Sequence, residues 1–148
     1  MTTVKQILQE KGHAVYTIQP DRSVYQALEM LVEYNIGALM VQDDAGRFLG
    51  VFSERDYARR VVLKGRNSRE TLIRDIMTEH PISVTAEDTL EHCMQLMTDK
   101  HIRHLPVVDG QQRLVGLVSI GDLVKQIIHD QQHTIQNLEK YISGAYHG

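Results

Sequence analysis

Tryptophan is absent from this chain of 148 residues, phenylalanine occurs twice, proline three times and cysteine once. The single cysteine, Cys93, cannot form a disulfide within the chain. Residues 1–12 lack the continuous apolar run of a secretory signal peptide. No segment approaches the roughly 18 consecutive apolar residues of a membrane-spanning helix. These absences predict a cytoplasmic protein that makes no contact with a membrane.

A large excess of charge of one sign is also lacking. The 16 lysine and arginine residues nearly balance the 19 aspartate and glutamate residues, and the formal net charge is −3. Without a positive overall field, nucleic acid is not an expected partner, and any site for an anion must be local. Hydrophobic residues make up 42% of the chain and charged residues 24%, a composition typical of one folded domain with a buried core.

The chain contains an internal repeat. Residues 16–62 align without a gap with residues 82–128, at a constant offset of 66 positions. Between positions 36 and 57, eight of 22 pairs are identical, whereas chance would give roughly one or two. The identical pairs are Ile36/Ile102, Leu39/Leu105, Val41/Val107, Asp43/Asp109, Arg47/Arg113, Gly50/Gly116, Ser53/Ser119 and Asp56/Asp122. Such a repeat determines the architecture before any single motif does.

Each unit has the same predicted order of elements, β-α-β-β-α. In the first unit a strand at 16–18 precedes a helix with apolar residues at helical spacing, and strands at 38–41 and 48–52 form a hairpin. Another helix begins at Glu54. The second unit has its strands at 82–84, 105–108 and 114–118, and its last helix from Ile120. The expected fold class is therefore α/β, with the two units packed sheet to sheet about a pseudo-twofold axis, because neither unit covers its own sheet.

Three further segments lie outside the aligned units. A helix is expected at 3–10, a polar linker at 64–70, and a long final helix that runs from about Ile120 to a stop at Ser143-Gly144. The later apolar residues of that helix are Ile127, Ile128, Ile135 and Leu138. They favour docking on a second subunit, and packing back onto the same module is an equally economical alternative.

Several stretches of the second repeat resemble a known family. They are HIRHLPVVD at 101–109 and RLVGLVSIGDL at 113–123, and the lead-in Asp75-Ile76-Met77-Thr78 fits the same pattern. Together they resemble the tandem cystathionine-β-synthase (CBS) domain pair, often called a Bateman module. The first repeat is a looser match, because Gly37-Ala38-Leu39-Met40 stands where the second has Arg103-His104-Leu105-Pro106.

The resemblance implies one Bateman module over residues 1–148, with CBS repeats at 10–63 and 76–129 and a helical extension and tail at 130–148. It also implies a flat, disc-like homodimer that binds an adenosine-containing ligand between its repeats. AMP, ADP or ATP is the first expectation, and NAD(H) or S-adenosylmethionine are alternatives. Such a module would act as an energy or redox-state sensor, and an enzyme that it regulates would be a further partner.

The ligand-binding signature of this family is a hydroxyl residue three positions before an acidic one, and it occurs twice. The two copies are Ser53-Glu54-Arg55-Asp56 and Ser119-Ile120-Gly121-Asp122. Taken alone, Ser-x-x-Asp before an apolar run also indicates a helix N-cap, in which the serine oxygen accepts a backbone N–H. The two interpretations are compatible, since an aspartate carboxylate can accept both ribose hydroxyl protons. The resemblance favours ribose binding at Asp56 and Asp122.

The resemblance also assigns the basic residues. Arg103 and His104 are expected to reach across the pseudo-twofold axis to the cleft of Asp56, with Arg55 as a further candidate for phosphate. The cleft of Asp122 would instead contain Gly37 and Ala38, assisted by Lys11. The first cleft would then be the more cationic of the two. The expected apolar walls around adenine are Tyr16, Ile36, Ile82 and Ile102.

Metal binding and catalysis have weaker support in the sequence. The pairs His101/His104 and His129/His133 have ligand-like spacing, but no cysteine or acidic partner stands at a fitting distance, so no metal is expected. Cys93 aligns with Ala27 and is expected to be a core residue. No nucleophile–base set and no Gly-rich phosphate loop is present. The alternatives to a nucleotide sensor are a dimerisation or assembly module with vestigial clefts and, less favoured, an enzyme of unknown type.

Overall fold

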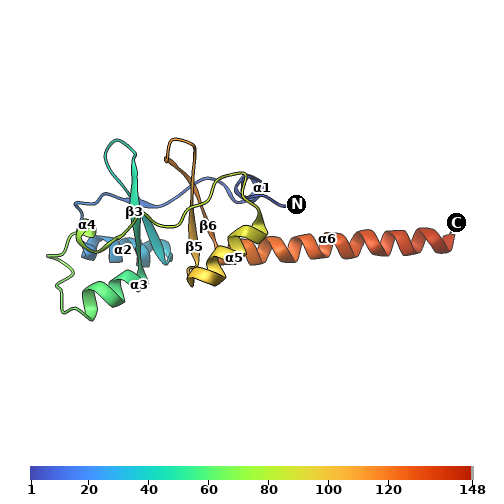
Figure 1. Ribbon diagram of the computed structural model, residues 1–148. Coiled ribbons are helices and arrows are strands. Elements are labelled where there is room, and N and C mark those ends of the chain that lie inside the picture. Colours follow the sequence, from blue (N-terminus) through green and yellow to red (C-terminus); the bar gives the residue numbers. More distant parts are fainter. Residues whose placement is uncertain (148) are drawn as a thin grey trace.

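The computed structural model describes residues 1–147 and contains the predicted repeat of elements (Figure 1). The chain opens with α1 (Val4–Lys11). The first repeat then consists of β1 (Thr17–Ile18), α2 (Val24–Tyr34), β2 (Ala38–Gln42), β3 (Phe48–Ser53), α3 (Glu54–Asp56) and η1 (Tyr57–Val62). The second follows the short elements α4 (Ile73–Ile76) and β4 (Thr78–Glu79), and consists of α5 (Leu90–Lys100), β5 (His104–Val108), β6 (Leu114–Ser119) and α6 (Ile120–His147). The α/β fold class is confirmed.

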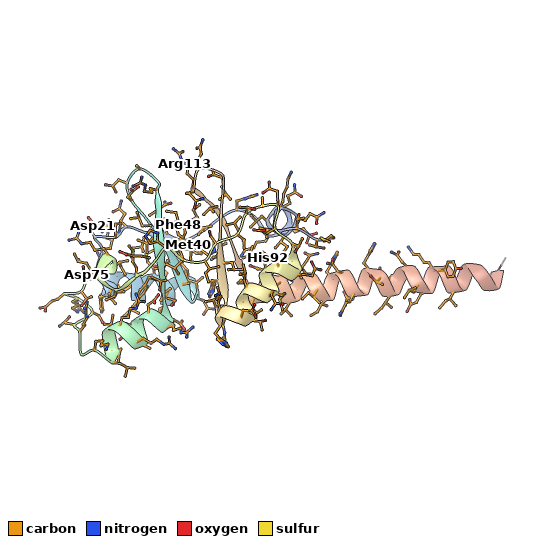
Figure 2. The ribbon with its side chains drawn as sticks, in the orientation of Figure 1. Asp21, Met40, Phe48, Asp75, His92 and Arg113 are labelled. Atoms are coloured by element: carbon orange, nitrogen blue, oxygen red, sulfur yellow. The ribbon has the colours of Figure 1, made fainter. Side chains whose placement is uncertain are left out.

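The two hairpins have equivalent registers. Ala38 pairs with Ser53 in the first, and His104 pairs with Ser119 in the second, at the repeat offset of 66. At the hairpin tips, Arg47 forms an isolated bridge with Arg113, which is its own equivalent in the other repeat. Figure 2 labels Arg113 at this tip, and Figure 1 shows the hairpins side by side. A pseudo-twofold axis therefore passes between the two hairpins.

The strand expected at 82–84 is reduced to a single bridge between Val84 and Val107. In the first repeat, the Met40 N–H donates to the Tyr16 carbonyl at 3.1 Å and extends β1 along β2. Pro106 occupies the equivalent position and has no N–H to donate. The ladder on this side of β5 is therefore shorter than the sequence pattern predicts.

The lead-in segment of each repeat packs on the other repeat. The N–H of Val4 in α1 donates to the Asp88 carbonyl at 2.8 Å, and the N–H of Ile73 in α4 donates to the Arg22 carbonyl at 2.9 Å. Val4 and Leu8 are buried in the core of the second repeat, whereas Ile73 is buried in the core of the first. In addition, β4 extends the sheet of the first repeat by pairing with β3. The repeats are thus tied together by exchanged segments.

Each repeat has its own hydrophobic core. Phe52, Leu39 and Val41 lie at the centre of the first, and their equivalents Val118, Leu105 and Val107 lie at the centre of the second. Ala27 and Cys93 are both fully buried at equivalent helix positions, so the prediction that Cys93 is a core residue is confirmed.

The final helix, α6, is longer than predicted. It continues through Ser143-Gly144 to His147, so the expected stop is wrong. A glycine within a helix costs about 1 kcal/mol relative to alanine, which weakens a helix without ending it, and no proline follows. Residues 131–143 are all exposed, and in Figure 1 this part extends away from the module. Packing back on the module is therefore found for Ile127, which contacts the core of the second repeat, and is wrong for the exposed Ile135 and Leu138. No helix within residues 1–147 has the length and apolar character needed to cross a membrane.

Candidate functional site

Asp56 lies at the start of the helical run that follows β3. Its Oδ2 accepts hydrogen bonds from the Ser53 N–H at 2.9 Å and the Ser53 hydroxyl at 3.0 Å, and its Oδ1 accepts one from the Thr78 hydroxyl at 2.9 Å. The residue is only 8% exposed. The carboxylate therefore caps a helix and fastens β4 to the first repeat.

Asp122 lies at the equivalent position in the second repeat, with different partners. Its Oδ2 accepts from the Ser119 N–H at 2.8 Å and from the Lys11 ammonium. Lys11 comes from the last turn of α1 and also donates to the Leu117 carbonyl at 2.7 Å. No hydrogen bond from the described residues reaches Oδ1 of Asp122. Lys11 and Asp122, both expected in the second cleft, are therefore in direct contact.

His104 lies at the axis between the two hairpins. The β5–β6 register places it opposite Ser119, which is three residues before Asp122. Its Cε1 is 3.6 Å from the position that a Cβ on Gly37 would occupy, so His104 lies against the start of the other hairpin. His104 thus reaches across the axis to the first repeat, and the expectation that it serves the cleft of Asp56 stays a prediction. Strand register keeps it beside the serine and aspartate of its own repeat, with Gly37 across the axis.

The charges around His104 and Asp122 are coupled. Burial lowers the pKa of His104, and the Lys11 ammonium lowers it further, while the Asp122 carboxylate acts in the opposite direction. Burial alone would raise the pKa of Asp122, but the hydrogen bonds from Lys11 and the Ser119 N–H outweigh it and lower that pKa. At neutral pH the site therefore holds a neutral His104 imidazole and an ionised Asp122 carboxylate.

The lowered pKa of His104 makes stability depend on pH. Below the ordinary histidine pKa of about 6.5, the unfolded chain binds a proton that the folded chain resists. The free energy of unfolding should therefore fall as the pH drops through the ordinary histidine pKa of about 6.5, and His104→Asn should reduce this dependence on pH. Urea titrations at several pH values measure how the free energy of unfolding changes with pH. The matched control is His133→Asn, because His133 is exposed on α6. Equal slopes in wild type and His104→Asn would contradict the effect.

Among the described residues, neither arginine of the expected phosphate set forms an ion pair with Asp56 or Asp122. Arg55 Nη1 donates to the His101 carbonyl at 2.9 Å, so its side chain bridges from the first repeat to the end of α5. The Arg103 carbonyl accepts from the Ile120 N–H at 2.9 Å, and its side chain is exposed. Both arginines thus lie on the side of the axis where α5 ends.

The residues expected to form the walls around adenine differ in burial. Ile36 and Ile102 are partly buried against the cores of their own repeats, and Ala38 is buried. Tyr16 is 48% exposed and stacks on Tyr34, with 4.2 Å between ring centroids. Ile82 is exposed, and no described contact ties it to the other wall residues.

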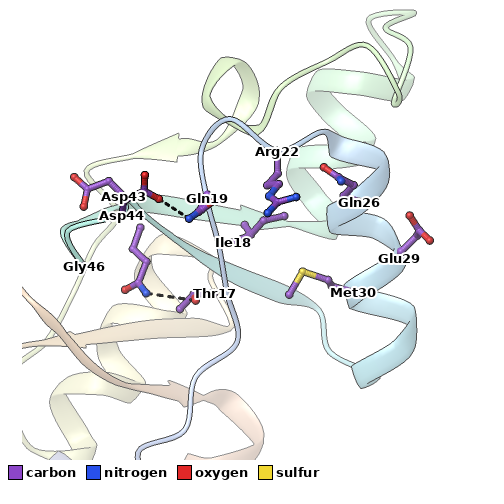
Figure 3. A pocket seen from close by; sticks show the side chains of 11 residues that line it. Thr17, Ile18, Gln19, Arg22, Gln26, Glu29, Met30, Asp43, Asp44 and Gly46 are labelled. Atoms are coloured by element: carbon purple, nitrogen blue, oxygen red, sulfur yellow. Dashed lines mark hydrogen bonds between the residues drawn. The ribbon is translucent and has the colours of Figure 1, made fainter.

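A hollow of about 640 Å³ lies elsewhere, between β1, α2 and the tip of the first hairpin (Figure 3). Figure 3 shows Arg22 and Glu29 projecting from the α2 side and Asp43 and Asp44 from the hairpin tip. The Asp44 carboxylate accepts a hydrogen bond from the Gln19 amide. None of the residues predicted to bind nucleotide lines this hollow.

Comparison with known proteins finds one CBS domain in each of the two repeats. The CBS domain family model matches residues 4–63 and 73–129. The chain belongs to the CBS domain family. Among curated CBS proteins, mitochondrial CBSX3 of Arabidopsis thaliana is 37% identical, covering 98% of this chain and 74% of the relative. A signal-transduction protein with CBS domains from Burkholderia ambifaria is 46% identical with a TM-score of 0.81, covering 88% of this chain and 96% of that one.

Two solved CBS structures in the comparison contain adenosine-based ligands. CBSX2 in complex with AMP is 28% identical, with a TM-score of 0.74 over 88% of this chain and 99% of that chain. The CBS domain pair of MJ0100, in complex with 5′-methylthioadenosine and S-adenosylmethionine, is 26% identical with a TM-score of 0.76, over 88% of this chain and 98% of that chain. Proteins of this fold therefore include binders of adenosine compounds.

Two side-chain contacts near the candidate site are not predicted by the sequence pattern. Thr78, the last residue of the lead-in Asp75–Thr78, donates a hydrogen bond to Asp56. Tyr34, at the end of α2, stacks on Tyr16. Both contacts join segments distant along the chain, and a repeat alignment alone carries no signal for them.

The histidine side chains that the structure describes form no cluster suited to a metal ion. In the part of the chain that the structure describes, no three His, Cys, Asp or Glu side chains lie close enough to hold one metal ion. His129 Nδ1 is 3.7 Å from the carboxylate of Asp130. The two histidine pairs singled out by spacing thus lack a third ligand among the described residues.

Cys93 should be unreactive in the folded protein. It is fully buried, and burial raises the pKa of its thiol to about 11, with the nearby Asp88 carboxylate as a second cause. Because the thiolate is the nucleophile, we expect a disulfide reagent to label Cys93 at about pH 8 only after denaturation. Labelling of the native protein as fast as of the urea-unfolded chain would contradict this.

Proposed function

We propose that this CBS pair is a non-catalytic regulatory module that binds an adenosine-containing nucleotide at Asp122, as a sensor of energy or redox state. The observation that carries the proposal is the Asp122 carboxylate, which lies at a helix start beside Lys11 and His104 and has one oxygen without a described partner. A ribose diol is recognised by an open carboxylate, and phosphate is recognised by an ammonium and an adjacent helix N-terminus.

The two aspartates differ in their capacity for a ribose. A carboxylate has about four lone-pair sites. Asp56 uses three of them, for the Ser53 N–H and hydroxyl and the Thr78 hydroxyl, and is nearly buried. Asp122 uses two, both on Oδ2. Ribose binding at Asp56 requires breaking the contact with Thr78, so we assign the primary site to Asp122.

Lys11, the basic residue in contact with Asp122, supports an anionic ligand. Lys11 reaches Asp122 from α1, and the arrival of a ribose diol would compete with that contact and free the ammonium for phosphate. Because α1 packs on the second repeat, a shift of Lys11 is transmitted to the packing between repeats. AMP, ADP and ATP are the first candidates, and NAD(H) and S-adenosylmethionine share the adenosine. The partner that reads the change would be a regulated enzyme in the cytoplasm.

Calorimetric titration of the full chain tests this function. AMP, ATP, NAD and S-adenosylmethionine are compared with GMP, which changes the base, and with 2′-deoxy-AMP, which removes one ribose hydroxyl. We expect at least one adenosine compound to bind and the deoxy analogue to bind at least about tenfold more weakly, because one partner of the carboxylate is lost. If none of the four adenosine compounds gave a measurable heat of binding, the proposal would be overturned.

A second candidate is an assembly module whose nucleotide sites are vestigial. The exposed face of α6 specifically favours it. In that case dimerisation would proceed normally while none of the adenosine compounds raised the melting temperature of the protein.

A further inference from the structure

The distal part of α6, residues 131–143, is exposed along its whole length. The most C-terminal side-chain hydrogen bond between α6 and another element in residues 1–143 is donated by the Thr2 hydroxyl to the Asp130 carboxylate, at 2.8 Å. Every residue from 131 to 143 is exposed, and Figure 1 shows this part standing free of the module. An isolated helix of such length is marginal in water, and Ile135, Ile142 and Gly144 are weak helix formers. A partner along one face would stabilise it.

Five of the six large hydrophobic residues exposed on α6 within residues 120–143 form a single seam, and Tyr141 lies beside it. Successive seam positions alternate in spacing between four and three residues, which is the a and d pattern of a coiled coil. The apolar members are each 44% to 57% exposed. The a positions are Ile128, Ile135 and Ile142, and the d positions are Val124, Gln131 and Leu138.

The seam composition identifies its partner. β-Branched residues at a with leucine at d favour two parallel strands over higher oligomers. All three a positions here are isoleucine, and Leu138 occupies a d position. We propose that the distal parts of α6 from two copies of this chain form a parallel, in-register, two-stranded coiled coil. A second copy supplies the same seam, so no other protein is required.

Gln131 determines the orientation of the pair. In a parallel pair each seam residue faces its own counterpart, so the two Gln131 amides face and hydrogen-bond each other. In an antiparallel pair, a positions face d positions, and Gln131 would lie opposite Ile135 or Ile142 with its amide unpaired. A buried amide without a partner is costly, and the parallel register avoids this cost.

The coiled coil would be continuous with the candidate ligand site. One helix carries Asp122 in its first turn and the first apolar seam residue, Val124, two positions later. The two copies of the module would therefore emerge from the same end of the coil. The coil itself does not require a bound nucleotide.

Sedimentation equilibrium of the full chain tests the seam. The double variant Ile135→Glu/Leu138→Glu places charge at an a and a d position, and Gln136→Glu/Asn137→Glu places the same charge outside the seam. We expect the first to raise the dimer dissociation constant at least about tenfold and the control to leave it within about twofold. All four positions are exposed in the protomer, so the module should retain its melting behaviour. A monomeric wild type, or equal dissociation constants for the two variants, would overturn the proposal.

A cross-linking experiment tests the orientation. In a Cys93→Ala background, Leu138→Cys places a thiol at a d position, and Lys140→Cys places one on the exposed outer face. Under mild oxidation the parallel, in-register coil brings the two thiols introduced at the d position within disulfide range and keeps the control thiols apart. We expect at least about tenfold faster dimer formation on a non-reducing gel for Leu138→Cys. Equal rates for the two variants would exclude the parallel register.

Discussion

Replacing Asp122 by alanine should remove the thermal stabilisation conferred by AMP, whereas Asp56→Ala should retain it. Oδ1 of Asp122 accepts no hydrogen bond from the described residues and can therefore accept one from a ribose hydroxyl. The Asp56 carboxylate already accepts three hydrogen bonds. A ligand at one hundred times its dissociation constant stabilises a protein by about 2.7 kcal/mol. For a chain of this size, that corresponds to a shift of roughly 5–10 °C.

The measurement is a melting curve with and without AMP for each variant, compared with that variant's own ligand-free curve. This comparison matters because both changes also affect the fold. Asp56→Ala leaves the half-buried Thr78 hydroxyl without its partner and should lower the ligand-free melting temperature more than Asp122→Ala does. Retention of the AMP shift in Asp122→Ala together with its loss in Asp56→Ala would reverse the assignment of the primary site.

Gly50→Ala should destabilise the fold by about 3 kcal/mol. A Cβ at this position would lie 2.4 Å from the carbonyl oxygen of Thr78, closer than nonbonded atoms approach. The obstructing atom belongs to the backbone of β4, which is paired with β3, so the clash is relieved only by separating the strands. Urea denaturation followed by circular dichroism measures the change.

The repeat supplies the matched control for this substitution. Gly116 is the equivalent of Gly50, and a Cβ there would lie 2.9 Å from the two terminal methyl carbons of Leu8. A leucine side chain can rotate, so Gly116→Ala should cost about 1 kcal/mol. Equal destabilisation by the two substitutions would show that the β3–β4 pairing does not hold the backbone in place.

The repeat, the hairpins and the Ser-x-x-Asp helix starts were predictable from the sequence. Identical pairs such as Ser53/Ser119 fix the alignment, and strand alternation with turn residues fixes the hairpins. Capping is local, because the serine and the aspartate are three residues apart. These features can be predicted because they depend on residues that are close together in the sequence.

The remaining features depend on contacts between distant segments. The exchange of α1 and α4 between the repeats, the hydrogen bond from Thr78 to Asp56 and the position of Lys11 on Asp122 each join residues that no local pattern relates. The placement of His104 could have been derived from its pairing with Ser119 in the predicted hairpin. The boundaries proposed from sequence at 10–63 and 76–129, the homodimer and the cytoplasmic location stay predictions.

A crystal structure of the full chain with AMP would show whether the nucleotide binds at Asp122. We expect the ribose hydroxyls to lie within hydrogen-bond distance of the Asp122 carboxylate, with Lys11 turned from that carboxylate toward the phosphate. AMP bound at Asp56, or in the hollow between β1 and α2, with the contact between Lys11 and Asp122 unchanged, would contradict it.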